Sequence, residues 1–114
     1  MNFDYASEIL HKISKKILKN GLPKNVDLLN INVPSYPSSD EIKITKLSDK
    51  MFNPEIIKNK HENNETYYLI KPTMIEKYEE ETDGYVLLNE KLVSITPIKS
   101  DMTSLKNEIK KIIQ

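Results

Sequence analysis

The chain has 114 residues, 17 of them basic and 17 acidic, so its formal net charge is zero. This balance argues against a nucleic-acid-binding protein, which normally carries a basic excess or a clustered basic face. Hydrophobic residues make up 38% and charged residues 30%, which indicates one folded domain, 1–114, with a modest core. No apolar run approaches the roughly 18 residues of a membrane span, and the first residues show no signal pattern.

The residue types that are absent or rare exclude several kinds of binding and catalytic site. The chain has no cysteine, which excludes disulfides and thiolate sites and fits a reducing, cytoplasmic setting. All 17 basic residues are lysines, so the planar guanidinium fork that grips phosphate is not available. Gly21 and Gly84 are the only glycines, which is too few for a glycine-rich phosphate loop.

Residues 4–20 are predicted to form an amphipathic helix, because apolar residues recur there at helical spacing. The apolar positions are Ala6, Ile9, Leu10, Ile13 and Ile17. We expect Asn2 or Asp4 to cap the start of this helix. Asn20-Gly21 should end it with a left-handed residue, and Pro23 prevents it from continuing.

Two runs that end at proline predict the main strands of a sheet. In 28–33 the leucine, isoleucine and valine side chains share one face and the asparagines take the other. The run 92–98 is the most strand-like in the sequence, with Val93 and Ile95 on one face. We expect 92–98 to be the strand around which the sheet and its helices are organised.

The stretch between these two runs is less regular. Residues 42–46 alternate apolar and polar side chains, which predicts a half-buried or edge strand. Residues 48–65 read as polar and irregular. Residues 66–70 predict another strand, which either pairs with 42–46 or lies in a hairpin arm that leaves the body. An acidic loop at 78–84 then leads into a short helical turn at 85–88.

A final helix is expected at about 103–113, with Asp101 or Thr103 as its cap. One face carries an apolar stripe made of Leu105, Ile109, Ile112 and Ile113. A helix this short is marginal alone in water. We therefore expect the stripe to dock either on the chain's own body or on another subunit.

Candidate catalytic and metal-binding groups are few. Neither histidine fits a catalytic triad, because His11 lies on a solvated helix face and His61 lies in a polar loop tip. An acidic group could suggest a hard-cation site, but consecutive acids diverge and the pattern is more typical of a solvated loop. Its members are Glu79, Glu80, Glu81 and Asp83. From the residues we predict no catalytic and no metal-binding side chain, and the substrate-binding residues stay unknown.

Tyr67 and Tyr68 admit two interpretations. Paired aromatic rings on a strand could stack a base or a nucleotide. A tyrosine pair on a strand is more often half core and half interface, and we favour that interpretation.

Several stretches occur in the order and spacing of one known family. They are 28–34, 43–46, 67–70, 82–83, 93–98 and 101–103. The most specific is Val93-Ser94-Ile95-Thr96-Pro97-Ile98, followed by Asp101-Met102-Thr103. On these residues the chain resembles the C-terminal half of the survival protein E (SurE) family, the 5'/3'-nucleotidases. The resemblance covers nearly the whole chain.

The resemblance implies an α/β fold, or α+β for this part alone. It would have a mixed sheet, flanking N- and C-terminal helices and a projecting hairpin at about 42–72. It also implies a phosphatase of nucleoside monophosphates that depends on a divalent metal, Mg or Mn. The family's metal-binding Asp-Asp-Gly segment, with a Ser and an Asn further along, has no counterpart in this chain. We therefore expect no cofactor held by this chain itself.

The resemblance further implies a role in assembly. The partner would be another copy, in a dimer or tetramer, or the missing N-terminal nucleotidase half. The candidate interface residues are Tyr67, Tyr68, Leu69, Ile70, Leu105, Ile109, Ile112 and Ile113. Three departures from the family pattern affect local shape. Leu69 replaces a tryptophan, Lys71-Pro72 replaces a glycine, and Asn89-Glu90-Lys91 replaces the glycine before the Val93 strand. We expect Asn89 to take the positive φ there.

Three hypotheses about function follow. The chain is a fragment or separately made half of a nucleotidase, which supplies scaffold and oligomerisation. Alternatively, it is a stand-alone, non-catalytic structural or interaction module derived from that family. The third hypothesis is a nucleotide-binding module that uses Tyr67 and Tyr68.

Overall fold

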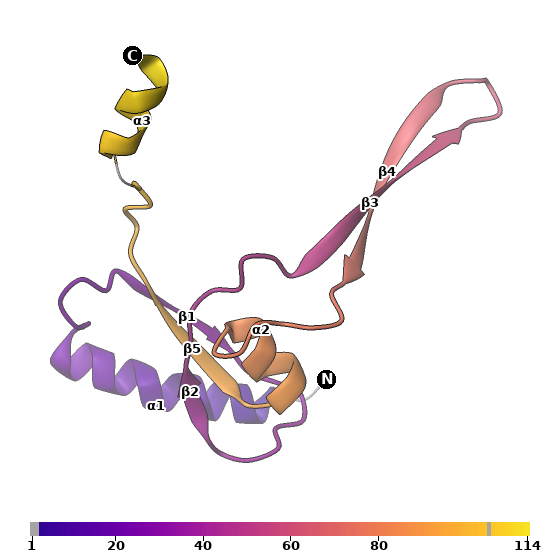
Figure 1. Ribbon diagram of the computed structural model, residues 1–114. Helices are drawn as coiled ribbons and strands as arrows, with labels where there is room; N and C mark the ends of the chain where they lie inside the picture. Colours follow the sequence, from indigo (N-terminus) through magenta and orange to yellow (C-terminus); the bar gives the residue numbers. More distant parts are fainter. Residues whose placement is uncertain (1–2, 105) are drawn as a thin grey trace.

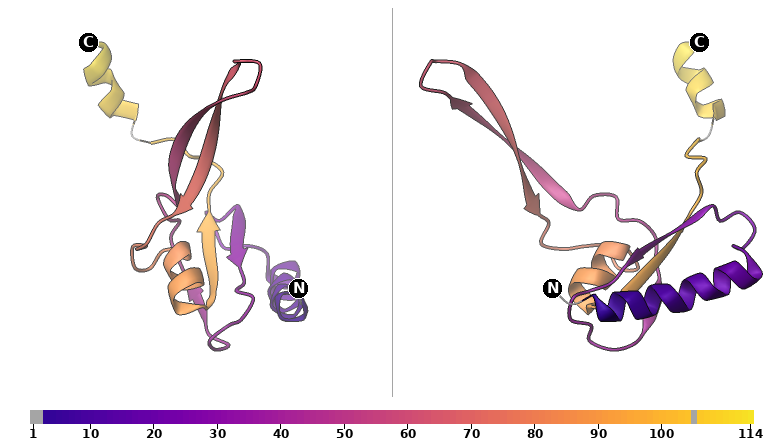
Figure 2. Two further views of the ribbon diagram at one scale, coloured as in Figure 1. Left: turned by 90° about the vertical axis from the view of Figure 1, so that its right-hand side faces the viewer. Right: turned by 180° about the vertical axis from the view of Figure 1, so that it is seen from behind.

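The molecule is drawn out rather than spherical (Figure 1). The computed structural model describes residues 3–104 and 106–114. Its radius of gyration is 19.7 Å, whereas a compact domain of this length would have about 13 Å. A hairpin arm and a C-terminal helix both project from a small body (Figures 1 and 2).

The body is built on a three-stranded mixed sheet. Its strands are β1 (Leu28–Asn32), β2 (Ile42–Ile44) and β5 (Val93–Ile98), in the order β1-β5-β2. β1 runs antiparallel and β2 parallel to β5. The predicted organising strand is therefore the central one. Four consecutive residues of β5, from Val93 to Thr96, are buried.

One face of the sheet packs against α1 (Asp4–Asn20) and forms the apolar core. Ile9, Val93 and Ile95 are its buried members. The side chains that pack against them are partly buried: Tyr5, Ile13, Leu29, Ile31, Val33 and Ile42. The predicted helical and strand periodicities are confirmed at Ile9, Ile13, Val93 and Ile95, whereas Leu10, named for the same helix face, is exposed. The core is small, so much of the chain's apolar surface lies elsewhere.

The other face of the sheet is polar and is covered by α2 (Asp83–Tyr85) and a π-helical turn, η1 (Val86–Glu90) (Figure 2). Ser94 and Thr96 are buried there, and the hydroxyl oxygens of Thr45 and Thr96 lie 2.7 Å apart. This bond satisfies two hydroxyls that burial would otherwise leave without water. The predicted helical turn at 85–88 lies within the observed helical segment.

The predicted C-terminal end of α1 is confirmed, but the predicted N-terminal cap is not. Gly21 has φ 74°, and its N–H donates to the carbonyl of Ile17 at 2.7 Å, so the expected positive-φ stop is confirmed. The prediction that Asp4 caps the helix is wrong, because Asp4 is already helical. The residue before the helix is Phe3, whose side chain makes no capping hydrogen bond. The alternative cap, Asn2, lies outside the described residues.

The turn before β5 places its left-handed residue at Lys91, with φ 56° and ψ 44°. The prediction that Asn89 takes this conformation is wrong, because Asn89 lies inside η1. The Lys91 N–H donates to the carbonyl of Val86, which closes the helical turn. A residue with a Cβ pays about 1–2 kcal/mol in this region of φ and ψ.

Lys91→Gly is therefore expected to raise the free energy of unfolding by about 1 kcal/mol, because glycine adopts a positive φ without a clash. Lys91 is exposed, so removing its side chain should cost little packing. Urea denaturation followed by circular dichroism measures the change. Lys91→Ala is the control and should bring no gain, since alanine retains the Cβ.

The arm is a two-stranded hairpin of β3 (Phe52–Lys60) and β4 (Thr66–Met74). The interpretation of 48–65 as irregular is wrong, because β3 lies within it. β3 is exposed along almost its whole length, so no burial pattern marks it in the sequence. Of the two pairings left open for 66–70, the hairpin arm is the observed one. The 42–46 segment belongs to the main sheet, so the arm begins later than the expected 42.

The C-terminal helix α3 (Lys106–Ile113) stands apart from the body and has no buried residue (Figure 1). Its start lies a few residues after the expected 103, and the predicted stripe residue Leu105 lies outside the described residues. Asp101 does not cap this helix. Instead, its carboxylate accepts a bond from the Thr103 N–H at 2.9 Å, which forms a local turn. The predicted α/β class, with a mixed sheet, flanking helices and a projecting hairpin, is confirmed.

Candidate functional site

A cluster that we call the base clasp joins the two legs of the arm to the body. Its members are Ser48, Tyr78, Asp83 and Gly84. Ser48 precedes β3, and Asp83 opens α2. One carboxylate oxygen of Asp83 accepts three bonds: from the Ser48 N–H at 2.8 Å, the Ser48 hydroxyl at 2.7 Å and the Gly84 N–H at 2.9 Å. Asp83 is only 9% exposed, so these bonds replace the water that the carboxylate has lost.

Tyr78 closes the clasp from the other leg of the arm. Its ring is buried against Gly84, and its hydroxyl donates to the carbonyl of Met51 at 3.3 Å. A Cβ on residue 84 would lie 2.6 Å from Tyr78 Cδ1 and 2.7 Å from the Ser48 hydroxyl oxygen. A glycine is therefore required at residue 84 by this close approach.

Backbone bonds continue the clasp along the chain. The Lys46 N–H donates to the Glu81 carbonyl at 3.1 Å, and the Asp83 N–H donates to the Lys46 carbonyl at 2.9 Å. The Lys46 ammonium also pairs with the Glu79 carboxylate at 2.8 Å. These contacts hold the start of one leg and the end of the other side by side, so they fix where the arm leaves the body.

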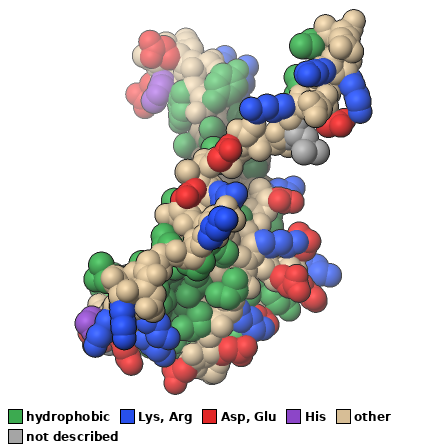
Figure 3. Space-filling view, turned by 90° about the vertical axis from the view of Figure 1, so that its left-hand side faces the viewer, with side chains coloured by type: hydrophobic (Ala, Val, Ile, Leu, Met, Phe, Trp, Pro, Cys, Tyr) green, Lys and Arg blue, Asp and Glu red, His purple; other side chains and the backbone are tan. Residues whose placement is uncertain are grey.

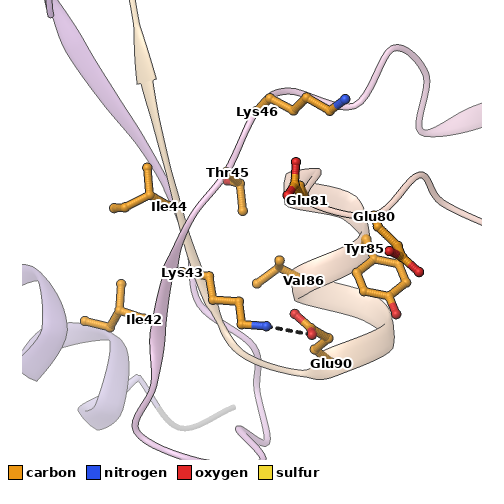
Figure 4. A pocket seen from close by; sticks show the side chains of 10 residues that line it. All are labelled: Ile42, Lys43, Ile44, Thr45, Lys46, Glu80, Glu81, Tyr85, Val86 and Glu90. Carbon is orange, nitrogen blue, oxygen red and sulfur yellow. Dashed lines mark hydrogen bonds and ion pairs between the residues drawn. The ribbon is translucent and has the colours of Figure 1, made fainter.

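A groove of about 830 Å³ runs beside β2 and η1 (Figure 4). Its lining residues come from β2 and the segment after it, and from the acidic loop and η1: Ile42, Lys43, Ile44, Thr45, Lys46, Glu80, Glu81, Tyr85, Val86 and Glu90. The Lys43 ammonium crosses it to reach the Glu90 carboxylate at 2.7 Å. The groove is thus charged, and each of its two lysines is paired with a glutamate.

The two lysines of the groove are held protonated. The hydrogen bond from Lys43 to Glu90 raises the pKa of Lys43, and the bond from Lys46 to Glu79 does the same for Lys46. Neither amine can therefore act as a base near neutral pH. The one buried hydroxyl of the lining, Thr45, is bonded to Thr96 rather than to a base. The groove therefore offers paired cations and a bonded hydroxyl, an arrangement suited to contact and positioning.

The acidic residues do not fit a Mg or Mn site. Glu79 is paired with Lys46, and Asp83 turns inward to Ser48 and Gly84. Within residues 3–104 and 106–114, no three His, Cys, Asp or Glu side chains gather as ligands for one ion. A hard cation needs several oxygens converging on one point.

The remaining sequence candidates are dispersed. His11 lies on the exposed face of α1, far from the base clasp in the chain. His61 lies at the arm tip, where its ring meets that of Tyr67 with a centroid separation of 4.4 Å. Tyr67 and Tyr68 are consecutive in a strand, so they point to opposite faces and cannot stack on one base together.

The tail that carries α3 is tied to the body by Asp27. The Asp27 carboxylate accepts bonds from the Ser100 N–H at 2.7 Å and from the Ser100 hydroxyl at 2.8 Å. These bonds, the backbone one first, lower the pKa of Asp27 below its ordinary value. The stabilisation that they give is present above the unfolded-state pKa of Asp27 and is lost as the pH falls through the folded-state pKa.

An NMR titration of the Asp27 carboxyl carbon should therefore give a pKa below that of an unstructured aspartate. Ser100→Ala removes the hydroxyl donor and should move this pKa back toward the ordinary value. An unchanged pKa in Ser100→Ala would show that the side-chain bond does not form in solution. Asp101, whose pKa is lowered by its own bonds from Thr103, serves as an internal control and should not respond.

Sequence reasoning missed the partners in the base clasp. Ser48 and Tyr78 looked like ordinary loop residues because their contacts are with residues distant in the chain or across the arm. The one available signal was the scarcity of glycine. Gly21 is explained by the helix end, so Gly84 could have been recognised as a position where another part of the chain approaches closely. The Lys43–Glu90 pair, with partners far apart in the chain, left no local signal.

The small mixed sheet, the projecting arm and the separate terminal helix define an α/β protein. The chain belongs to the SurE family of 5'-nucleotidases and corresponds to the C-terminal part of its members. A 5'-nucleotidase SurE from Thermococcus kodakarensis is 40% identical over 116 residues, which cover 99% of this chain and 45% of that protein. Its counterpart from Methanosarcina acetivorans is 38% identical over 103 residues, covering 90% of this chain and 39% of that protein.

The fold comparison agrees with the sequence comparison. The crystal structure of the SurE protein from Aquifex aeolicus matches with a TM-score of 0.75 at 23% identity, covering 100% of this chain and 47% of that one. No protein-family model matches the chain. The chain thus spans less than half the length of these relatives. Among the described residues, no helix has the length and apolar character needed to cross a membrane.

Proposed function

We propose that this chain is the scaffold and assembly part of a SurE-type 5'-nucleotidase, a phosphatase of nucleoside monophosphates. The observation that carries this proposal is the correspondence of 99% of the chain to 45% of a relative named 5'-nucleotidase SurE. The catalytic metal, Mg or Mn, would be held by an N-terminal half that supplies the acidic ligands. The absence of cysteine supports a cytoplasmic setting for the complete enzyme.

The sheet itself supports a missing half. β1 and β2 each pair only with β5 among the described residues, so both edges of the three-stranded sheet are open. Open edges present unpaired backbone groups, which proteins normally cover or pair. β2 also forms a wall of the 830 Å³ groove. A strand or loop of the N-terminal half would complete the sheet and border the groove along β2.

The exposed apolar residues support assembly with further copies. On the arm, Tyr67, Tyr68, Leu69 and Ile70 are all exposed, and Ile70 most of all. On α3, all three described members of the predicted stripe are exposed: Ile109, Ile112 and Ile113. Exposed apolar surface of this extent is typical of interaction sites. We keep these residues, together with Leu105, as the proposed oligomer interface.

Hydrolysis of AMP in the presence of Mg²⁺ or Mn²⁺ tests the proposal. The chain alone should give no turnover above buffer. Mixing it with the N-terminal portion of the Thermococcus kodakarensis relative should restore turnover, because that portion would bring the metal ligands. A matched mixture with an N-terminal portion whose Asp-Asp pair is changed to Asn-Asn should stay inactive.

Robust AMP hydrolysis by the chain alone would contradict the proposal, since its catalytic half would then not be elsewhere. A mixture that neither associates nor hydrolyses AMP would favour the alternative of a stand-alone interaction module. The DNA upstream of the Met1 codon distinguishes the two independently. An in-frame Asp-Asp-Gly strand there supports the nucleotidase, and a stop codon without such a neighbouring gene supports the module.

A further inference from the structure

A second pocket lies on the body where the loop after β1 meets η1, and we call it the rim pocket. Its volume is about 340 Å³, within the range of about 300–1,000 Å³ that is typical of small-molecule sites. The segment after β1 supplies four of its lining residues, and η1 with the turn after it supplies three: Val33, Pro34, Ser35, Tyr36, Leu87, Leu88 and Lys91. This set shares no residue with the groove beside β2 or with the base clasp.

The loop that carries Tyr36 is tied to the turn before β5. The Ser38 hydroxyl donates to the carbonyl of Glu90 at 2.7 Å, and the Ser38 N–H donates to the carbonyl of Lys91 at 2.9 Å. Prolines at 34 and 37 stand on either side of Ser35-Tyr36, and each has its φ fixed by its own ring. The loop is therefore constrained before any ligand arrives, so less conformational entropy is lost when a ligand binds against it.

The rim pocket presents apolar and aromatic surface to solvent. Tyr36 is 86% exposed, and within residues 3–104 and 106–114 its ring meets no other aromatic ring. Leu88, across the pocket on η1, is also exposed. Contiguous exposed apolar surface marks an interaction site more often than a single exposed residue does. Hydrophobic side chains also gather on the arm (Figure 3), but that surface already has a place in the proposed assembly.

The charge of the rim pocket selects an anionic ligand. Lys91 is the one charged residue among the seven that line it. The two lysines of the groove beside β2 are paired with glutamates, whereas Lys91 forms no ion pair within the described part of the chain. An ammonium group binds phosphate as a compact point charge. The pocket thus combines an aromatic ring, an apolar floor and one cation available to an incoming anion.

This combination matches one class of ligand: we propose that the rim pocket binds a nucleoside monophosphate, with its base against Tyr36 and its phosphate beside Lys91. A nucleobase offers a flat π-face that stacks on an aromatic side chain. The proposal rests on the proposed function, which supplies the substrate class, and it adds where the nucleoside of that substrate is held. All the lining residues belong to this chain, so the chain alone should bind a nucleotide that it does not hydrolyse.

An NMR titration of the full chain with AMP measures the affinity and locates the site by its shifts. Tyr36→Ala should weaken AMP binding at least fivefold, because the stacking platform is lost. Tyr36→Phe keeps the ring and should stay within twofold. Phe52→Ala removes an exposed ring from the arm and should leave the affinity unchanged. No binding at millimolar AMP, or a loss in Tyr67→Ala without a loss in Tyr36→Ala, would overturn the proposal.

Lys91→Gly tests the phosphate contact without a risk of unfolding, because this substitution is expected to stabilise the turn. It should weaken AMP binding at least threefold and leave the affinity for adenosine, which has the same base and no phosphate, within twofold. Lys91→Ala removes the same ammonium without a gain in stability and should lose AMP affinity to the same extent. Unchanged AMP binding in both variants, or an equal loss for adenosine, would overturn the placement of the phosphate beside Lys91.

Failure here can be told apart from failure of the proposed function. In the AMP assay with an added N-terminal portion, Tyr36→Ala should raise KM for AMP at least fivefold and change kcat less than twofold. Its KM for ribose 5-phosphate, which has no base, should not change. Restored turnover with an unaffected KM for AMP would remove the rim pocket and leave the proposed nucleotidase standing. AMP binding that is lost in Tyr36→Ala, without any restored turnover, would do the reverse.

Discussion

Asp83→Ala is expected to lower the free energy of unfolding of the body by about 3 kcal/mol. The substitution leaves the Ser48 N–H and the Gly84 N–H without the acceptor that they share. Both lie in the base clasp, where water has limited access, so the loss is larger than that of one surface hydrogen bond. Urea denaturation monitored by circular dichroism measures the change.

Two controls define what Asp83 contributes. Glu80→Ala removes a nearby, exposed carboxylate and should change the unfolding free energy by less than about 0.5 kcal/mol. Ser48→Ala, alone and combined with Asp83→Ala, forms a double-mutant cycle. The two losses should not add, because both variants break the same contact. An additive result, or a loss under about 1 kcal/mol for Asp83→Ala, would contradict the clasp as the anchor of the arm.

Ile109→Asp is expected to weaken self-association at least tenfold while leaving the unfolding free energy of the monomer unchanged. Ile109 is 56% exposed on α3, a helix without a buried residue, so a charge there enters water in the monomer. In an assembly the same charge would have to be buried against apolar surface, which is costly. Sedimentation equilibrium and urea denaturation at low protein concentration separate the two effects.

Asn107→Asp is the matched control for α3, because it adds the same side chain two residues away on another face of the helix. Its effect on association should stay within about twofold, since surface changes away from a contact are nearly neutral. A loss of several kcal/mol of monomer stability in Ile109→Asp would instead mean that α3 docks on its own body in solution. A chain that stays monomeric at every concentration would contradict an assembly role for α3.

The elements that could be predicted from the sequence are those with one buried and one exposed face. Ile9 and Ile13 recur at helical spacing and Val93 and Ile95 at strand spacing, and these residues do build the core. The stop at Gly21 also followed from local chemistry. These features are readable because each depends on a short stretch of chain that faces one uniform environment.

The features that sequence reasoning missed depend on residues without such a pattern. β3 is exposed on both faces, so Ile56 and Ile57 follow each other without alternation. The left-handed residue was assigned to Asn89 by propensity, yet the turn geometry of η1 required it at Lys91. The base clasp joins Ser48 to Asp83 across the whole arm, a distance along the chain that no local signal spans.

The thinness of the core has a dynamic consequence. Cooperative protection against amide exchange needs a shared, buried scaffold, and only the α1–sheet body offers one. The backbone amides of β5 should exchange by global opening alone. Those of β3, β4 and α3 should exchange far earlier, by fraying that leaves the body intact. In deuterium labelling, the amides of the body should exchange slowly and those of the arm and of α3 rapidly. Binding of a partner to the arm or to α3 should slow their exchange.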